Sequence, residues 1–94
     1  MPSANVTLAG SVGRDFEADG TERTATLQVP GGRVYNPSAT DVWINENAGT
    51  VSTTSGGGST RIPQGREHKL RPTCKAFTFK TSGVSSYPVF TPNG

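Results

Sequence analysis

Apolar residues occur in this chain only as short runs, and turn-forming residues interrupt each of them. Within the segment 33–70, Val42-Trp43-Ile44 is preceded by Asn36-Pro37-Ser38 and followed by Asn45-Glu46-Asn47-Ala48-Gly49. Runs of this length between turn residues are typical of antiparallel strands, and helical periodicity is absent. The sequence therefore predicts an all-β domain of six to eight short strands, in a small antiparallel β-sandwich or a jelly-roll-like barrel with extended terminal arms.

The chain is small and poor in apolar residues, which limits how well it can stabilise itself. It has 94 residues, of which 31% are hydrophobic. Its one cysteine, Cys74, cannot close an internal disulfide, and Cys74 with the single histidine, His68, provides too few ligands for a zinc site. Small scaffolds without such supports usually gain stability by oligomerisation. We therefore expect no metal or cofactor, and we expect the chain to associate with itself.

Acidic and basic residues are separated along the chain. Six of the seven acids lie at or before Glu46, whereas six of the nine cations follow it. An acidic half and a basic half suit self-association, or docking on an acidic surface. The later cations are Arg61, Arg66, Lys69, Arg71, Lys75 and Lys80.

The chain divides into three segments. Residues 1–13 form an N-terminal arm or first strand, 14–81 form the β-sandwich domain, and 82–94 form a C-terminal strand or arm. Neither a signal peptide nor an apolar run near the ~20 residues of a membrane helix is present. We therefore expect a protein that is made and kept in the cytoplasm unless it leaves as part of a larger particle, and that has no membrane partner.

Alternating patterns place the strands of the central segment. We expect strands at 24–29 and 75–80, the second with Phe77 and Phe79 on one face. Further strands are predicted at 33–36, 41–45, 49–52 and 67–70, with a hairpin joining the first two of these, a tight turn at 62–65 and a surface loop at 55–60.

Trp43 is predicted to point to the opposite face from its neighbours in the strand 41–45. Val42 and Ile44 share one face, so Trp43 must point to the other. If the two aliphatic residues belong to the core, another segment covers Trp43 or the residue lies in an interface, where tryptophan is enriched. A carbohydrate-binding role would require an exposed Trp43.

Motifs that suggest chemistry are each better explained without it. Asp15, Glu17 and Asp19 resemble the start of a calcium loop, but the position that should close the loop is Thr26. His68 and Cys74, with Glu67 as orienting acid, could form a nucleophilic pair, but their spacing does not bring them together. We expect solvated acids, a surface histidine and a small buried cysteine, and we expect no enzyme activity.

Nucleic acid is a competing partner. The basic run after residue 60, together with Phe77 and Phe79, has the components of a face that binds single strands. The phenylalanines are also needed for the core, because few other large apolar residues are available. We therefore favour a core role for both and disfavour nucleic-acid binding.

One further pattern in the central segment consists of Val34-Tyr35-Asn36-Pro37-Ser38, Val42-Trp43-Ile44-Asn45, Gly49-Thr50 and Ile62-Pro63-Gln64-Gly65. In these residues the segment resembles small accessory virion proteins of tailed bacteriophages. This resemblance covers roughly forty residues and implies a jelly-roll-like or sandwich subunit, often trimeric, that is bound on a capsid or tail and has no catalytic residues.

We accordingly expect a non-enzymatic virion protein, with a capsid decoration (cement) protein as the first hypothesis. A tail, neck or baseplate accessory subunit and a nucleic-acid-binding β-barrel are the alternatives. The expected partners are further copies of the chain, as a homotrimer, and the major capsid protein or another virion protein. The expected contact aromatics are Tyr35, Trp43, Tyr87 and Phe90, and the expected docking cations are Arg61, Arg66, Lys69 and Arg71.

Overall fold

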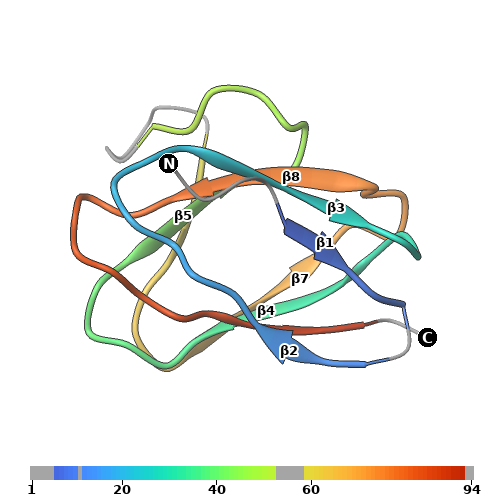
Figure 1. The fold of residues 1–94 in the computed structure, drawn as a ribbon, viewed down its shortest axis with the longest axis horizontal. Helices are drawn as coiled ribbons and strands as arrows, with labels where there is room; N and C mark the ends of the chain where they lie inside the picture. Colours follow the sequence, from blue (N-terminus) through green and yellow to red (C-terminus); the bar gives the residue numbers. More distant parts are fainter. Residues whose placement is uncertain (1–5, 11, 53–58, 93–94) are drawn as a thin grey trace.

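The structure is a computed structural model, and it describes residues 6–10, 12–52 and 59–92. The regular structure of this part consists of nine strands in two sheets packed as a sandwich (Figure 1). The all-β prediction is therefore confirmed, and the packing is sandwich-like. Over the same residues there is no helix that could reach across a membrane.

Sheet A has the strand order β1-β3-β8-β5-β6, and sheet B has the order β2-β9-β4-β7. Neighbouring strands are antiparallel, except that β1 runs parallel to β3. The strands are β1 Val6–Leu8, β2 Arg14–Asp15, β3 Arg23–Leu27, β4 Gly32–Asn36, β5 Val42–Asn45, β6 Thr60–Ile62, β7 Arg66–Leu70, β8 Ala76–Lys80 and β9 Val89–Thr91.

The core lies between the sheets and is formed by alternate residues of the strands. Phe77 and Phe79 of β8 both point into it, as the alternation predicts, and each is at most 1% exposed. Phe16 packs edge-on against Phe79, with ring centroids 4.8 Å apart, in a geometry that aromatic rings favour. Ala25 lies directly opposite Phe77 on β3, so a small side chain leaves room for a large one.

The two segments predicted to form a hairpin, 33–36 and 41–45, lie in different sheets, so that prediction is wrong. β4 pairs with β7 and β9, whereas β5 pairs with β6 and β8. The buried amide of Asn36 explains the difference. Its Nδ2 donates to the carbonyls of Thr40 and Ile62, each at 2.8 Å. These bonds direct the chain across to the other layer instead of back along its own sheet.

The predicted strand at 49–52 is also wrong, because this segment joins no sheet. Side chains bind its backbone instead: Thr78 Oγ1 donates to the Gly49 carbonyl, and Glu22 Oε1 accepts the Val51 N–H at 2.7 Å. Most of the predicted loop at 55–60 lies outside the described residues.

A tight turn does precede β7, one residue later than predicted. The Arg66 N–H donates to the Pro63 carbonyl at 3.1 Å. Gly65, the third residue of this turn, has a φ of 76°, a left-handed conformation that glycine adopts without steric cost.

Both terminal segments contribute strands within the described residues. β1 lies at one edge of sheet A, next to β3. β9 lies inside sheet B between β2 and β4, and its Phe90 is 1% exposed. Of the two possibilities for the segment 82–94, the described part therefore contains a strand; residues 1–5 and 93–94 lie outside it.

Candidate functional site

The outer face of sheet A is covered by the chain itself over β5 and β8, whereas Thr7 on β1 and Thr26 on β3 stay exposed. The connection after β5 passes over this sheet, above β8 in Figure 1, and bonds to Thr78. Thr78 is 3% exposed and Trp43 is 7% exposed, although both lie on the side of the sheet that faces away from the core. Trp43 is therefore a covered tryptophan, and we withdraw it from the set of contact aromatics and as a carbohydrate platform.

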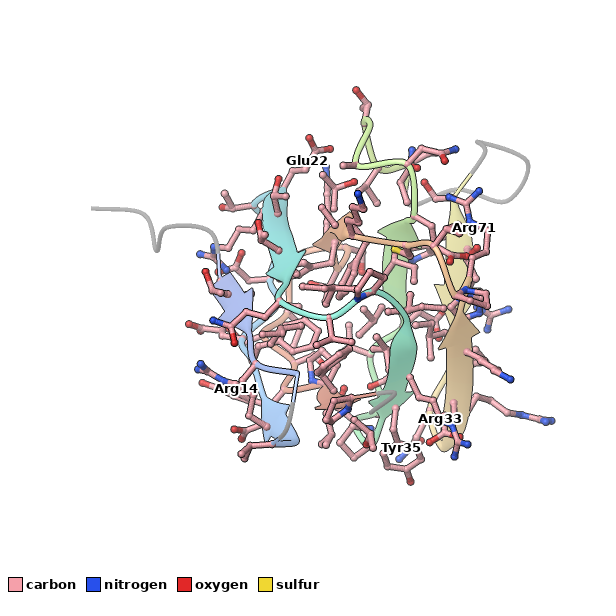
Figure 2. All side chains as sticks on the ribbon, turned by 90° about the vertical axis from the view of Figure 1, so that its right-hand side faces the viewer. Arg14, Glu22, Arg33, Tyr35 and Arg71 are labelled. Atoms are coloured by element: carbon pink, nitrogen blue, oxygen red, sulfur yellow. The ribbon has the colours of Figure 1, made fainter. Side chains whose placement is uncertain are left out.

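The outer face of sheet B, in contrast, carries an exposed apolar block. Tyr35 on β4 is 38% exposed, and Tyr87, which precedes β9, is 52% exposed. Val89 shares this face and lies directly opposite Tyr35, and Pro37 is exposed at the end of β4. Figure 2 shows Tyr35 pointing away from the sandwich. The fold thus brings together two of the four predicted contact aromatics.

Charged side chains flank this block at opposite corners. Asp15 and the exposed Glu17 lie along β2 on one side of it. Arg33 and Lys69 lie opposite each other on β4 and β7, toward the other end of the face. Glu67 is the remaining acid there, with its Oε1 3.8 Å from Arg33 Nη1. The acids on β2 and the two bases therefore occupy diagonally opposite corners of the face.

Sequence reasoning missed these flanking charges. If residues 86 to 91 are read as an extended strand, the two-residue period of a strand places Tyr87 and Val89 on one face. The cross-strand register that brings Asp15 and Arg33 beside them depends on contacts between distant segments, which the alternation of a single strand does not specify.

The four predicted docking cations lie along adjoining edge strands, β6 and β7, and just beyond them. In Figure 2 nitrogen-tipped side chains extend from this side of the molecule. Arg61 Nε is 2.7 Å from Asp41 Oδ2, and Arg71 Nη2 donates to Asn47 Oδ1 at 2.8 Å. For Arg66 and Lys69 the described part of the chain offers no carboxylate within ion-pair distance. We call this set of four cations the basic edge.

Glu46 connects the end of β5 to the end of β7. Its Oε2 lies 3.0 Å from His68 Nε2, and its Oε1 accepts the Arg71 N–H at 2.8 Å. Burial disfavours the charged carboxylate, but these hydrogen bonds and the nearby Arg71 charge outweigh it and hold the pKa of Glu46 below its ordinary value. The cluster therefore stabilises the junction between the two sheets at this edge.

Cys74 lies next to this cluster but is not activated by it. Its Sγ lies 3.7 Å from the Glu46 carbonyl oxygen and 3.4 Å from that of Ala76. Burial and the negative charge of Glu46 raise the pKa of the Cys74 thiol, which opposes formation of the reactive thiolate. The fold does bring His68 and Cys74 to one residue, which their spacing did not predict, but that residue is Glu46 and not Glu67.

The three acids that resemble a calcium loop do not converge. Asp15 and Glu17 lie on β2 and just after it, whereas Asp19 binds Arg23 through both carboxylate oxygens, each at 3.1 Å. The N–H of Thr21 is the main cause that lowers the pKa of Asp19. Among the described residues, no group of three or more His, Cys, Asp or Glu side chains is placed to hold a metal ion.

The remaining predicted aromatics belong to the core. Phe90 is 1% exposed and packs in the same cluster as Phe77 and Phe79, so we withdraw Phe90 as a contact residue. The core role favoured for Phe77 and Phe79 agrees with their burial. Neither ring is available to stack on a nucleobase, so the aromatic half of the nucleic-acid hypothesis has no support on this face.

Comparisons with known protein families, with curated proteins and with solved structures found no match to this chain.

Proposed function

We propose that this chain is a non-enzymatic structural subunit of a bacteriophage virion that binds the outer surface of the head and stabilises the junctions between coat subunits. Two observations support the proposal: the resemblance of the segment from Val34 to Gly65 to accessory virion proteins, and an all-β sandwich that agrees with what the resemblance implies. Its partners would be coat subunits, and its location the virion.

The observation that carries the docking part of the proposal is the basic edge. Four cations are concentrated on two adjoining edge strands, and the described acids near them neutralise only Arg61 and Arg71. The side chains of Arg66 and Lys69 are exposed. Such an edge attracts an acidic protein surface and directs the approach of the subunit toward it.

The expected work is mechanical. A subunit that binds the assembled shell, but not free coat proteins, stabilises the shell by mass action. Its binding free energy is gained only when the shell is assembled. Single exposed ion pairs contribute little each, so the docking must use several of them together. It should therefore weaken as the salt concentration rises.

Co-sedimentation of the purified protein with phage heads that lack it, and separately with tails, tests the proposal. The expected result is saturable binding to heads that declines as NaCl is added. Arg66→Glu should weaken this binding by roughly tenfold, since it places like charge in the interface. Arg14→Glu, a matched reversal on the opposite edge of sheet B, should leave it unchanged.

Each other outcome changes the proposal in a defined way. Binding to tails alone would overturn the head assignment in favour of a tail, neck or baseplate subunit. Binding to neither particle at low salt would refute the virion role. An equal loss for Arg66→Glu and Arg14→Glu would refute docking through the basic edge.

A further inference from the structure

We infer that the outer face of sheet B binds the same face of a second copy, so that the chain forms a two-fold dimer in which the strands of the two sheets cross at roughly a right angle. This inference goes beyond head binding and does not depend on it. It rests on the apolar block and on the diagonal arrangement of the charges around it.

The apolar block gives the centre of the contact. Tyr35 on β4 lies directly opposite Val89 on β9. Pro37, just after β4, and Tyr87, just before β9, extend the two strands at this end and are exposed. Tyrosines with exposed rings are enriched in the centres of interfaces, because they bury a large area at a low cost in side-chain entropy. The outer face of sheet A is covered by the chain over β5 and β8, and its exposed part on β1 and β3 presents Thr7 and Thr26. Among the described strands, the large exposed apolar side chain of a sheet face is therefore on sheet B.

The charges at the corners of this face favour a second copy of the chain as the partner. Asp15 and Glu17 occupy one corner of the face, and Arg33 and Lys69 occupy the diagonally opposite corner. A two-fold axis that lies in the plane of the face, across this diagonal, places the acidic corner of each copy on the basic corner of the other. A surface with this self-complementary pattern selects a second copy of itself.

The same axis sets the angle between the two sheets. The diagonal lies about midway between the strand direction and the direction across the strands, so rotation about the axis brings the strands of one copy nearly perpendicular to those of the other. Orthogonal packing is one of the two common ways in which sheets pack face to face. In this arrangement Glu17 approaches Lys69 of the second copy, and Asp15 approaches its Arg33.

This symmetry favours two copies over the three expected from the family resemblance. In a three-fold ring each interface joins two different patches of the chain. The pattern here complements itself, and a single face therefore satisfies the contact in both copies. Each charge pair then occurs twice in the dimer, which doubles the effect of any single substitution.

The contact is small, so the association should be weak. Four strands about 4.8 Å apart, of which the longest, β4 and β7, have five residues, give a face of at most roughly 15 Å by 17 Å. Such a face buries less than the ~800 Å² per partner of a standard interface. The dimer should therefore form at micromolar or higher protein concentration and dissociate on dilution.

Sedimentation equilibrium of the purified chain over a wide concentration range, in the absence of any virion particle, tests the inference. The expected mass rises from that of one copy to that of two. Glu17→Lys and Lys69→Glu should each weaken the dimer by roughly tenfold or more, because each places two like-charge contacts in the interface. The double variant that carries both changes restores both contacts with the signs exchanged and should regain most of the affinity.

Two further variants complete the design. Replacing both Tyr35 and Tyr87 by serine should leave a monomer, and because neither ring belongs to the core the variant should still unfold cooperatively on heating. Lys75→Glu, a reversal outside this face, should leave the dimer intact. A parent chain that stays monomeric at every concentration, a trimer, or a double charge variant as weak as the single ones would overturn the inference. None of these results depends on head binding, which is measured separately.

Discussion

The side-chain amide of Asn36 should contribute more to the stability of this fold than any single exposed charge. The residue is 0% exposed, and its Nδ2 donates to the carbonyls of Thr40 and Ile62. Its Oδ1 accepts the Ser38 N–H at 3.1 Å. One amide therefore joins the end of β4 to both the entry of β5 and the end of β6, which lie in the other sheet.

The substitution Asn36→Asp removes the two donated bonds with little change of shape, because the two side chains have nearly the same size and geometry. The aspartate cannot donate to the carbonyls when ionised, and it places negative charge against them. A buried acceptor left without a donor costs about 1–3 kcal/mol. The Ile62 carbonyl is buried and the Thr40 carbonyl is partly buried, so we expect a total loss of roughly 2–5 kcal/mol.

That loss is large against the ~5–15 kcal/mol that stabilises a typical domain. With a slope of about 1 kcal/mol per molar urea for a chain this small, the unfolding midpoint should fall by roughly 2 M or more. Trp43 provides the signal, since it is the single tryptophan and is 7% exposed in the folded chain. Gln28→Ala, at an exposed position, is the control and should change the stability by less than ~0.5 kcal/mol. A free energy of unfolding for Asn36→Asp that matches the control would refute the structural role assigned to this amide.

Two other perturbations test the packing and the electrostatics. Gly32 has a φ of 125°, and a Cβ there would lie 2.8 Å from the Thr91 carbonyl oxygen, so Gly32→Ala should destabilise the fold by more than the ~1–3 kcal/mol of backbone strain alone. Gly65→Ala, where a Cβ would meet nothing within 4 Å, should show only the strain, and equal urea midpoints for these two variants would contradict the close approach to β9. The carboxylate of Glu46 has a lowered pKa in the folded chain, so its contribution is present above its unfolded pKa and is lost as the pH falls through the folded value. The stability difference between the parent and Glu46→Gln should therefore be largest near neutral pH and shrink below about pH 4, as urea titrations over that range would show.

The sequence predicted the strands better than their pairing. The alternations at 24–29 and 75–80 correspond to β3 and β8, because alternate burial is a property of each strand by itself. The opposite orientations of Trp43 and its aliphatic neighbours followed from the same two-residue period, and the burial of all three side chains agrees with it.

Pairing failed where a distant contact decides it. The turn residues Asn36-Pro37-Ser38 suit a hairpin equally well, and of the two bonds that direct the chain to the other sheet, the one from Asn36 to Ile62 is long-range. Likewise the segment 49–52 has residues suitable for a strand, but the side chains of Thr78 and Glu22 bind its backbone in place of a neighbouring strand. These partners are far apart in the sequence, so local propensity carries no information about them.

The interaction surfaces also depend on contacts between distant segments, which the local sequence does not specify. Only the topology shows where the charges of the two halves of the chain lie relative to each other. The acidic first half and the basic second half of the chain are only a bias in composition until the fold places β2 and β7 at opposite edges of one sheet. That placement puts Glu17 from the first half and Lys69 from the second half at opposite corners of one face, and the fold adds Arg33, a base of the first half, beside Lys69.

A two-fold pair built on that face would also change how the basic edge acts. The pair presents two basic edges, related by the dimer axis. Lys69 of each copy is taken into the contact with Glu17, whereas Arg61 and Arg66 stay outside the sheet-on-sheet contact and remain the docking cations. If both edges reach coat subunits, the second attachment is intramolecular and gains from a high effective concentration. Weak, salt-sensitive docking by each copy would then suffice for stable attachment. Variants that dissociate the pair, such as Glu17→Lys, should accordingly lose head binding although their basic edge is intact, whereas Arg66→Glu should lose head binding and remain dimeric.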